Sequence, residues 1–279
     1  METVLTNGLT MLIDGDWVLH MCCNAVEYKW EENEEFEEDS SPPFEWVVDV
    51  WENKLNEWKH ILQTEAAPIV CFSGKDNFRK GVAKTKTYKG NRAEEKPFHY
   101  FNLKAYIEAT QTCLEEPRIE ADDLMAMMQD ELTIIVTVDK DLRQVNGWHY
   151  SPEGWNFPSF GPVYVTDENS YIELKGKKIV GTGYKFFWSQ VITGDPTDNI
   201  PGLHGKGPAF AMSLLEDCNS EEECYLKVRD AYRDNLLCAD DTLREQIDLL
   251  WMIREMDHGI PIRWREPYER HNTLSREVR

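Results

Sequence analysis

Apolar residues along the chain alternate between short runs typical of β-strands and longer stretches with helical spacing. Short apolar runs at 10–14, 68–72 and 133–138 predict three buried strands. A long helix is expected over 44–66, because large apolar side chains recur there on one face of a 3.6-residue period. This predicted core face, which includes three tryptophans, comprises Trp46, Val47, Val50, Trp51, Leu55, Trp58, Ile61 and Leu62.

The segments between these elements complete the first part of the chain. A mixed helical region is expected up to Leu114, and a further helix over 120–131. The acidic and then Ser- and Pro-containing stretch up to Pro43 is expected to be a solvated loop. Because strands alternate with helices, the pattern predicts an α/β fold with a mostly parallel sheet flanked by helices.

The second part of the chain is predominantly helical in its pattern. Helices are expected over 185–193, 208–216, 222–235 and 242–256. The stretch before them, 147–183, is rich in Gly, Pro, Ser and aromatic residues, and a β-hairpin is expected around 163–174. We therefore predict an α/β core over 1–183 and a helical region over 184–279.

Composition excludes several classes of protein. The 279 residues are 41% hydrophobic, enough for a core, and an apolar run of about 18 residues that could span a bilayer is absent from the sequence. The first twelve residues lack the pattern of a secretory signal, so a cytoplasmic location is expected. Seven scattered cysteines without a C-x-x-C pattern argue against disulfides and structural zinc.

Charge is distributed unevenly along the chain. The formal net charge is −21, which by itself disfavours nucleic-acid binding. The run 27–39 has eight acidic residues and one lysine, and no role is assigned to it beyond that of a solvated loop. By contrast, the segment 75–104 has nine basic and three acidic residues. This local excess of positive charge makes a nucleic-acid partner compatible with an acidic protein.

Carboxylates gather at four places along the sequence. Each place has an ordinary explanation when taken alone, because Asp and Glu cap helices and begin turns. Together, hard oxygen donors without His or Cys suit Mg²⁺ or Mn²⁺, and two such ions about 3.5–4 Å apart can support phosphodiester cleavage. The candidate ligands follow the first strand, open the helix at 120, follow the strand at 133 and follow the helix at 185; they are Asp14, Glu120, Asp122, Asp123, Asp139, Asp141, Asp195 and Asp198.

Four motifs follow one another along the chain, Thr87-Tyr-Lys-Gly-Asn-Arg92, Glu120-Ala-Asp-Asp123, Asp139-Lys-Asp141 and Gly194-Asp-Pro-Thr-Asp-Asn-Ile-Pro-Gly202. In these motifs and their order the chain resembles, from about Leu12 to Leu215, the flap endonuclease and bacteriophage 5′–3′ exonuclease family. The resemblance implies a PIN-like nuclease core followed by a helix-hairpin-helix region, with a basic arch or clamp at about 75–118. It also implies one metal group at Asp14, Glu120, Asp122 and Asp123, a second at Asp139, Asp141, Asp195 and Asp198, and contact of Lys89 and Arg92 with the scissile phosphate.

Two motifs depart from the family's pattern. The family carries another acid after the second strand, where this chain offers only Asp76 as an additional candidate ligand. The family's hairpin continues with a lysine and a threonine, which are absent from Gly205-Lys-Gly-Pro-Ala-Phe-Ala211. The resemblance implies a monovalent ion (K⁺) at this turn, although the lysine and threonine of the family's pattern are absent from it.

The turn at 200–207 and the basic segment are the expected DNA contacts. Glycines allow the backbone to approach a phosphate, and the helix start at Pro208 offers free N–H groups, so binding should be independent of sequence. Aromatic residues among the lysines at 88–106 could stack on bases of a single-stranded 5′ end, or they could face inward as core residues. The candidate DNA-binding residues are Lys84, Lys86, Tyr88, Gly202, Gly205, Lys206 and Gly207.

The sequence thus predicts a monomeric, divalent-metal-dependent 5′–3′ exonuclease. Flap endonuclease activity or RNase H-like activity is a further candidate activity of the same site. The expected partner is DNA with a 5′ end, whether duplex, nicked, gapped or flapped, and RNA–DNA hybrid is a further candidate. Two alternatives stay open at this point. One is a PIN-like metal-dependent ribonuclease, and the other is a non-catalytic, structure-specific DNA-binding protein.

Overall fold

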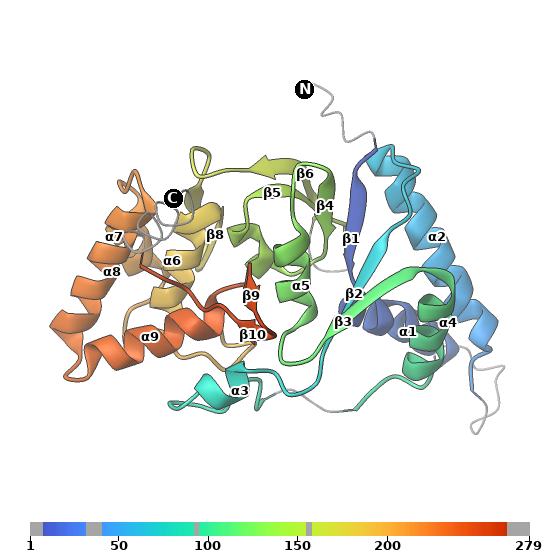
Figure 1. Cartoon of the computed structure of the whole chain (residues 1–279), viewed down its shortest axis with the longest axis horizontal. Coiled ribbons are helices and arrows are strands. Elements are labelled where there is room, and N and C mark those ends of the chain that lie inside the picture. Colours follow the sequence, from blue (N-terminus) through green and yellow to red (C-terminus); the bar gives the residue numbers. More distant parts are fainter. Residues whose placement is uncertain (1–7, 32–40, 92–94, 155–157, 267–279) are drawn as a thin grey trace. The chain divides into compact units, whose positions relative to one another are not determined.

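The computed structural model describes residues 8–31, 41–91, 95–154 and 158–266 (Figure 1). Arg92 and most of the acidic run at 27–39 lie outside these residues. The chain forms two compact units that interleave along the sequence. Unit 1 comprises 1–75, 93–139 and 147–164, and unit 2 comprises 76–92, 140–146 and 165–279. The expected domain ranges 1–183 and 184–279 stay a prediction.

Among the residues that the structure describes, six strands form one sheet in the order β3-β2-β1-β4-β5-β6. β1 runs parallel to β2 and to β4, with Leu12 opposite both Ile69 and Ile135, and the pairs β2–β3 and β4–β5 are also parallel. This arrangement confirms the predicted α/β fold with a mostly parallel sheet. The strands are β1 (Thr10–Asp14), β2 (Ile69–Ser73), β3 (Thr112–Glu116), β4 (Thr133–Val136), β5 (Gly147–Ser151) and β6 (Phe160–Val165).

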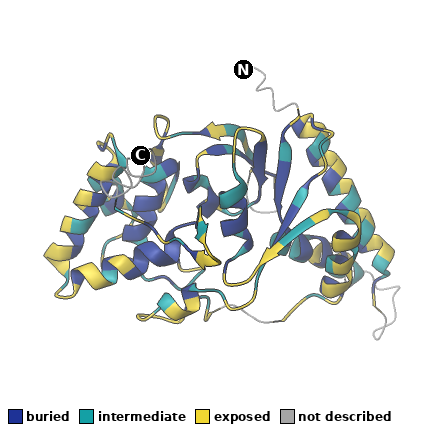
Figure 2. Cartoon of the chain, in the orientation of Figure 1, coloured by how far each residue is buried: buried dark blue, intermediate teal, exposed yellow. Residues whose placement is uncertain are grey.

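Helices cover the sheet because alternate strand residues point to opposite faces. Met11 and Ile13 of β1 are fully buried in a cluster that includes Trp51 and Trp58 of α2 (Phe44–Leu62). α1 (Gly15–Glu31) and α4 (Tyr100–Thr110) contribute to the same cluster. The short helix α5 (Ala121–Met128) packs against β1, β2 and β3. Figure 2 shows that β1, β4 and α5 are largely buried.

Three expectations for unit 1 were wrong. The expected loop after residue 26 is helical as far as Glu31, because Val18, Cys22 and Val26 extend a buried face along α1. The helical region that was expected to end at Leu114 ends earlier, because Leu114 belongs to strand β3. β3 is an edge strand with mostly exposed side chains, so its sequence shows no alternation of apolar and polar residues. On α2, Trp46 and Ile61 are exposed, so the buried face is narrower than the apolar pattern indicates.

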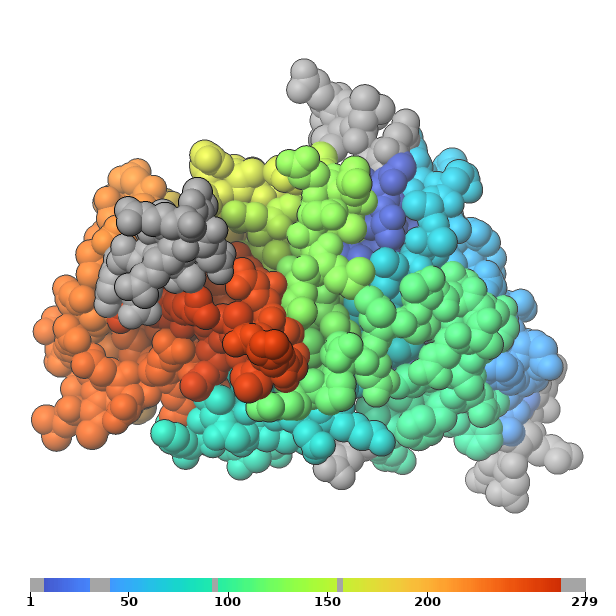
Figure 3. All heavy atoms as spheres, viewed as in Figure 1, coloured from blue at the N-terminus to red at the C-terminus, as the bar shows by residue number. Residues whose placement is uncertain are grey.

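Unit 2 is mainly helical. α6 (Gly183–Thr193) is buried over most of its length, and its hydrophobic residues contact α7 (Pro208–Leu215), α8 (Glu221–Asn235) and α9 (Ala239–Leu250). In the space-filling view α8, in orange, forms part of the surface (Figure 3). The remaining elements of the unit are α3 (Arg79–Val82), the 3₁₀ helix η1 (Lys140–Gln144), β7 (Tyr171–Lys175), β8 (Lys178–Thr182), β9 (Met256–Asp257) and β10 (Ile260–Pro261).

Two predicted boundaries in unit 2 were also wrong. The β-hairpin is formed by β7 and β8, with its turn at Gly176, and not by residues around 163–174. α9 ends at Leu250 instead of residue 256. There the buried guanidinium of Arg79 donates hydrogen bonds to the carbonyl oxygens of Leu249 (3.0 Å) and Trp251 (2.7 Å). A cation at a helix C-terminus offsets the partial negative charge of the last carbonyls, which favours termination at this point.

None of the described helices has the length and apolar content required to cross a lipid bilayer. The cytoplasmic location stays a prediction. All seven cysteines are free thiols. Cys22, Cys23, Cys71, Cys218 and Cys224 are buried, Cys113 is half-buried and Cys238 is exposed, so most behave as the small apolar residues expected.

Candidate metal centre and nucleic-acid interface

Asp14 lies at the point where the strand order of the sheet reverses direction. β1 is flanked by β2 on one side and by β4 on the other, and ligands of such sheets bind beyond the carboxyl ends of these strands. Asp14 is the last residue of β1, and Asp139 follows β4 by three residues. The Thr137 hydroxyl connects them, because it donates to Asp14 Oδ2 (3.0 Å) and accepts from the Asp139 N–H (3.1 Å).

The environment of Asp14 disfavours its negative charge. Burial raises the pKa of Asp14, and the neighbouring carboxylates of Asp16 and Asp139 raise it further. Hydrogen bonds from the Trp17 N–H and the Thr137 hydroxyl oppose this, and the resulting pKa is about 7. A divalent cation beside Asp14 would relieve the repulsion among the three acids.

Cys71 of β2 reports on a further carboxylate at this edge of the sheet. Burial raises the pKa of its thiol, and the charges of Asp14, Asp122 and Asp16 add to the effect. Asp14 and Asp122 are far apart in the sequence, yet both lie close enough to Cys71 to act on it. Asp16, which the sequence analysis did not select, belongs to this group, and its Oδ2 accepts a hydrogen bond from the Ser73 N–H (3.1 Å). In the sequence it resembles an ordinary acid in the first turn of a helix.

Glu120 and Asp123 form a capping box at the start of α5. The Asp123 side chain accepts a hydrogen bond from the Glu120 N–H (3.1 Å), and the Glu120 side chain accepts one from the Asp123 N–H. The Ser73 hydroxyl also accepts a hydrogen bond from the Ala121 N–H, which joins α5 to the end of β2. These hydrogen bonds fix both side chains at the start of α5, and the role of the two acids as metal ligands stays a prediction. Asp122 is half-buried and takes no part in the capping box.

In unit 2, Asp141 and Asp195 share one lysine. The Lys140 Nζ lies 2.6 Å from Asp141 Oδ1 and 3.2 Å from Asp195 Oδ2, and Gln190 donates to Asp141 Oδ1 (2.6 Å). Burial acts to raise the pKa of Asp195, but the Lys140 charge and the hydrogen bonds to its carboxylate outweigh this and lower it to about 2. Lys140 shows no such role in the sequence, because its second partner, Asp195, lies 55 residues away along the chain.

Asp198 and Lys89 contact each other within the same unit. The Lys89 Nζ lies 3.8 Å from Asp198 Oδ2, and the Lys89 N–H donates to the Asp198 carbonyl oxygen (2.9 Å). The Tyr88 hydroxyl donates to Asp198 Oδ2 (3.1 Å), and the Tyr88 ring is buried. Tyr88 is therefore placed to hold Asp198 instead of stacking on a base. Among the aromatic residues of the basic segment, Phe98 and Phe101, which belong to unit 1, are exposed to solvent.

Asp76 is exposed at a turn with a φ of 59°, and its role as a ligand stays a prediction. The other candidate ligands divide between the units, with Asp14, Glu120, Asp122, Asp123 and Asp139 in unit 1 and Asp141, Asp195 and Asp198 in unit 2. Within the part of the chain that the structure describes, no group of three or more His, Cys, Asp or Glu side chains forms a ready metal-binding cluster.

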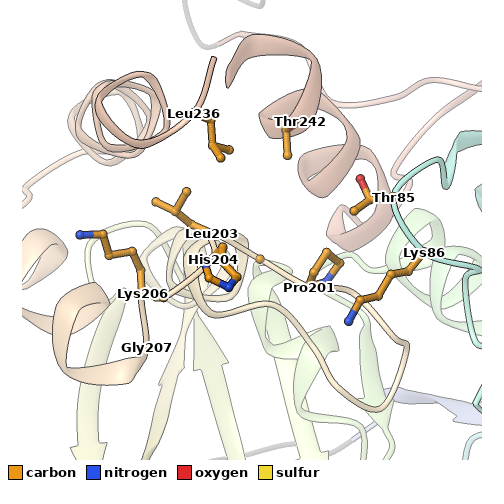
Figure 4. Close-up of a pocket in the computed structure, with 11 residues that line it drawn as sticks. Thr85, Lys86, Pro201, Leu203, His204, Lys206, Gly207, Leu236 and Thr242 are labelled. Carbon is orange, nitrogen blue, oxygen red and sulfur yellow. The ribbon is translucent and has the colours of Figure 1, made fainter. Parts of the chain in front are cut away.

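The predicted DNA-binding hairpin borders a cavity of about 680 Å³ in unit 2 (Figure 4). An antiparallel bridge between Asp195 and Ile200 closes the loop that precedes it. Gly202 has a φ of 65°, and a Cβ there would lie 2.3 Å from the Gly194 nitrogen, so only glycine fits. The cavity is lined by predicted DNA contacts from two distant segments, namely Lys86, Gly202, Gly205, Lys206 and Gly207.

No protein-family model matches the chain. The chain is 28% identical to DNA polymerase I of Deinococcus radiodurans over 185 residues, which are 61% of the chain and 18% of the polymerase. It is 32% identical to flap endonuclease Xni of Shewanella halifaxensis over 129 residues, 44% of the chain and 48% of Xni. The chain thus spans less than half the length of these curated relatives.

Solved structures of the bacteriophage T5 5′-exonuclease share the fold. The T5 D15 protein co-crystallised with metal ions superimposes with a TM-score of 0.58 at 18% identity, over 88% of the chain and 89% of D15. The T5 5′-exonuclease with bound divalent metal ions (zinc) gives a TM-score of 0.57 at 17% identity, over the same shares. The chain is therefore a homologue of DNA polymerase I and flap endonuclease Xni with the fold of a phage 5′-exonuclease, which confirms the resemblance predicted from its motifs.

Proposed function

We propose that the chain is a divalent-metal-dependent 5′–3′ nuclease that hydrolyses phosphodiesters near the 5′ ends of duplex DNA. The observation that carries the proposal is the placement of Asp14 and Asp139 beyond the carboxyl ends of β1 and β4, joined through Thr137 at the switch point of the sheet, in a homologue of a flap endonuclease. Carboxylates that repel each other, as Asp14 and Asp139 do, are costly to maintain unless a cation binds them.

The donor set fits Mg²⁺ or Mn²⁺. The candidate side chains offer carboxylate oxygens without imidazole or thiolate ligands, and hard divalent ions prefer such donors. The related T5 exonuclease has been solved with divalent metal ions, zinc among them. Two ions, when bound, would supply Lewis-acid stabilisation of the attacking and leaving oxygens of the phosphodiester. The proposed ligands are Asp14, Glu120, Asp122, Asp123 and Asp139 in unit 1, and Asp141, Asp195 and Asp198 in unit 2.

The chain's own residues would orient these ligands and the phosphate. Thr137 fixes Asp14 relative to the Asp139 backbone, and Lys140 neutralises part of the charge on Asp141 and Asp195. Lys89, held beside Asp198, would offset the negative charge that builds on the transferring phosphate. Arg92 is the proposed second cation of this pair.

The hairpin would hold the duplex by its backbone. α7 begins at Pro208 directly after Gly207, so its first N–H groups are available to a phosphate, and Lys86 and Lys206 line the adjacent cavity. These contacts read no base, which predicts binding independent of sequence. The structure of a T5 flap endonuclease variant with DNA and metal ions superimposes on this chain with a TM-score of 0.52. A K⁺ ion at the hairpin stays a prediction, because the family's lysine and threonine are missing there.

The alternatives differ in substrate and in catalysis. A PIN-like ribonuclease would cut single-stranded RNA and would not need a duplex-binding hairpin. A non-catalytic DNA-binding protein would bind flapped or nicked DNA without cutting it. The glycine-dependent geometry of the hairpin, with its lysines and helix start, favours a duplex DNA substrate over both single-stranded RNA and an ordinary loop.

The decisive experiment incubates the full chain with 5′-labelled duplex, nicked and flapped DNA, RNA–DNA hybrid and single-stranded RNA, each with Mg²⁺, Mn²⁺ or EDTA. We expect metal-dependent release of short products from DNA 5′ ends, and no cleavage in EDTA. Cleavage in EDTA, or cleavage of single-stranded RNA alone, would overturn the proposal. DNA binding without cleavage under every divalent ion would establish the non-catalytic alternative.

A further inference from the structure

Two neighbouring residues of α9 hold two different segments of unit 2. Glu245 is largely buried and accepts three hydrogen bonds from the basic segment. Its Oε1 accepts from the backbone N–H groups of Lys84 and Thr85, both at 2.7 Å, and its Oε2 accepts from the Thr85 hydroxyl at 2.8 Å. Gln246, the next residue, is fully buried, and its Oε1 accepts a hydrogen bond from the Gly202 N–H at 2.9 Å.

The contacts of Glu245 fix the basic segment upstream of Lys89. Hydrogen bonds to an ionised carboxylate are stronger than neutral ones, and here one carboxylate binds two successive peptide groups. Downstream, the Asn199 side chain donates to the Thr87 carbonyl oxygen (2.8 Å), and the Lys89 N–H donates to the Asp198 carbonyl oxygen (2.9 Å). The chain from residue 84 to residue 89 is thus held at both ends, which restricts the position of the Lys89 ammonium group.

The contact of Gln246 fixes the hairpin instead. Gly202 packs so closely on the end of α6 that a Cβ there would lie 2.5 Å from the Ile192 carbonyl oxygen. Gln246 satisfies the N–H of this crowded residue from the other side. The cavity of Figure 4 lies between the segments that the two α9 residues hold. Thr85 and Lys86 line one part, residues 201–207 line another, and Thr242 of α9 lines a third.

We propose that Glu245 is a positioning residue for Lys89, and that Gln246 is the corresponding positioning residue for the hairpin. This inference rests on the proposed nuclease function. α9 sets the separation of the two DNA-contacting segments, since residues 242, 245 and 246 lie on one face of the helix. Loss of Glu245 should therefore slow the chemical step, whereas loss of Gln246 should weaken DNA binding.

The experiment compares Glu245→Ala, Glu245→Gln and Gln246→Met in the full chain. Single-turnover cleavage of 5′-labelled duplex is measured at saturating protein with Mg²⁺, and the Kd for the same DNA is measured in EDTA. Glu245→Ala should slow cleavage about tenfold with Kd within about twofold of the wild type, since small displacements of a group that acts in the transition state are costly. Glu245→Gln should recover much of the rate, because its carbonyl oxygen can still accept the backbone N–H groups.

Gln246→Met should show the opposite split, with a Kd raised about fivefold and an unchanged rate at saturation. Asp241→Asn removes a carboxylate from the exposed part of the same helix and serves as the matched control, with both quantities unchanged. In the double variant Lys89→Ala/Glu245→Ala, the rate should equal that of Lys89→Ala alone, since Glu245 acts through Lys89.

Full activity of Glu245→Ala would overturn the inference. So would a double variant Lys89→Ala/Glu245→Ala whose loss of rate is the product of the two single losses. A third contradicting result would be that Glu245→Ala and Gln246→Met each lose cleavage rate and DNA affinity to the same extent. If the wild-type protein cleaves no DNA, the proposed function fails, and amide hydrogen exchange then tests the contact by itself. Exchange at Thr85 and Lys89 should accelerate in Glu245→Ala but not in Asp241→Asn, and unchanged exchange would refute the role of Glu245.

Discussion

The carboxylates of unit 1 and those of unit 2 accommodate buried negative charge in opposite ways. Asp14 in unit 1 accepts hydrogen bonds from neutral donors and lies near two other acids, and its pKa rises to about 7. Asp195 in unit 2 lies 3.2 Å from the ammonium group of Lys140, and its pKa falls to about 2. Asp14 therefore ionises only in part at neutral pH unless a cation from solution binds beside it, whereas Asp195 has the ammonium group of Lys140 as its counter-ion.

The largest expected effect comes from removing a carboxylate next to Asp14. Asp139→Asn should lower kcat by about a thousandfold or more, because a lost metal ligand removes about 4 kcal/mol of transition-state stabilisation. DNA binding in EDTA should persist. The measurement is steady-state cleavage of 5′-labelled duplex in Mg²⁺, with Asp49→Asn on the exposed side of α2 as the control. Full activity would exclude Asp139 from the site.

The pH dependence of stability should separate the two groups in the metal-free protein. The folded-state pKa of Asp14 is above its ordinary value, so the folded protein binds the proton more tightly and loses stability as pH rises from about 4 to about 7. Asp14→Asn should remove this loss, up to about 4 kcal/mol at pH 7. Urea unfolding in EDTA across this range provides the test, and an equal slope in variant and wild type would contradict the assignment.

Asp195 should behave in the reverse sense under the same conditions. Its lowered pKa contributes stability that is complete above pH 4 and is lost as pH falls toward 2. The same urea series with Asp195→Asn should therefore show a difference from wild type that is constant above pH 4 and shrinks in acid. A difference that grows as pH falls would refute the stabilising role of Lys140.

Lys89 sharpens the comparison because it brings a second lysine to the unit 2 carboxylates. Lys89→Ala should reduce the single-turnover rate by about a hundredfold while the Kd for DNA changes little, since a cation that stabilises developing charge acts mainly in the transition state. Lys80→Ala removes an exposed lysine from the neighbouring helix α3 and should leave the rate unchanged. Equal effects of the two substitutions would mean that Lys89 provides only general positive charge.

The smallest effect is expected at Lys140, which is about half exposed and therefore screened by solvent. Lys140→Met should lower the free energy of unfolding in EDTA by about 1 kcal/mol, because Asp141 and Asp195 lose their shared counter-ion. Addition of Mg²⁺ should then raise Tm more in the variant than in the wild type. An identical Mg²⁺-induced rise in both proteins would indicate that no ion binds near these acids.

Much of the fold could be predicted from the sequence, because its signals are local. The apolar runs that form β1, β2 and β4 and the helical spacing in α2 and α6 are visible within a few residues. β3 was missed because an exposed edge strand shows no apolar alternation. α1 was missed over its whole length, because its buried face is narrow and its second half merges into the acidic run.

The candidate site was only partly predictable, because its electrostatics depend on distant partners. Motif spacing selected Asp14, Asp139 and Asp195, but not Lys140, whose effect arises from a residue far along the chain. Glu245 looks like any glutamate on an amphipathic helix until its bonds to the backbone of Lys84 and Thr85 are known. Side chains that act on backbone groups of a remote segment leave no pattern in the sequence.

The distribution of the cysteines makes the protein convenient to label. Burial raises the pKa values of Cys22, Cys71 and Cys224, which keeps these thiols protonated and unreactive at neutral pH. Cys238 is exposed, directly precedes α9 and lies two residues from Leu236, which lines the cavity beside the hairpin. A maleimide dye should therefore attach selectively at Cys238, and its fluorescence should change when duplex DNA binds.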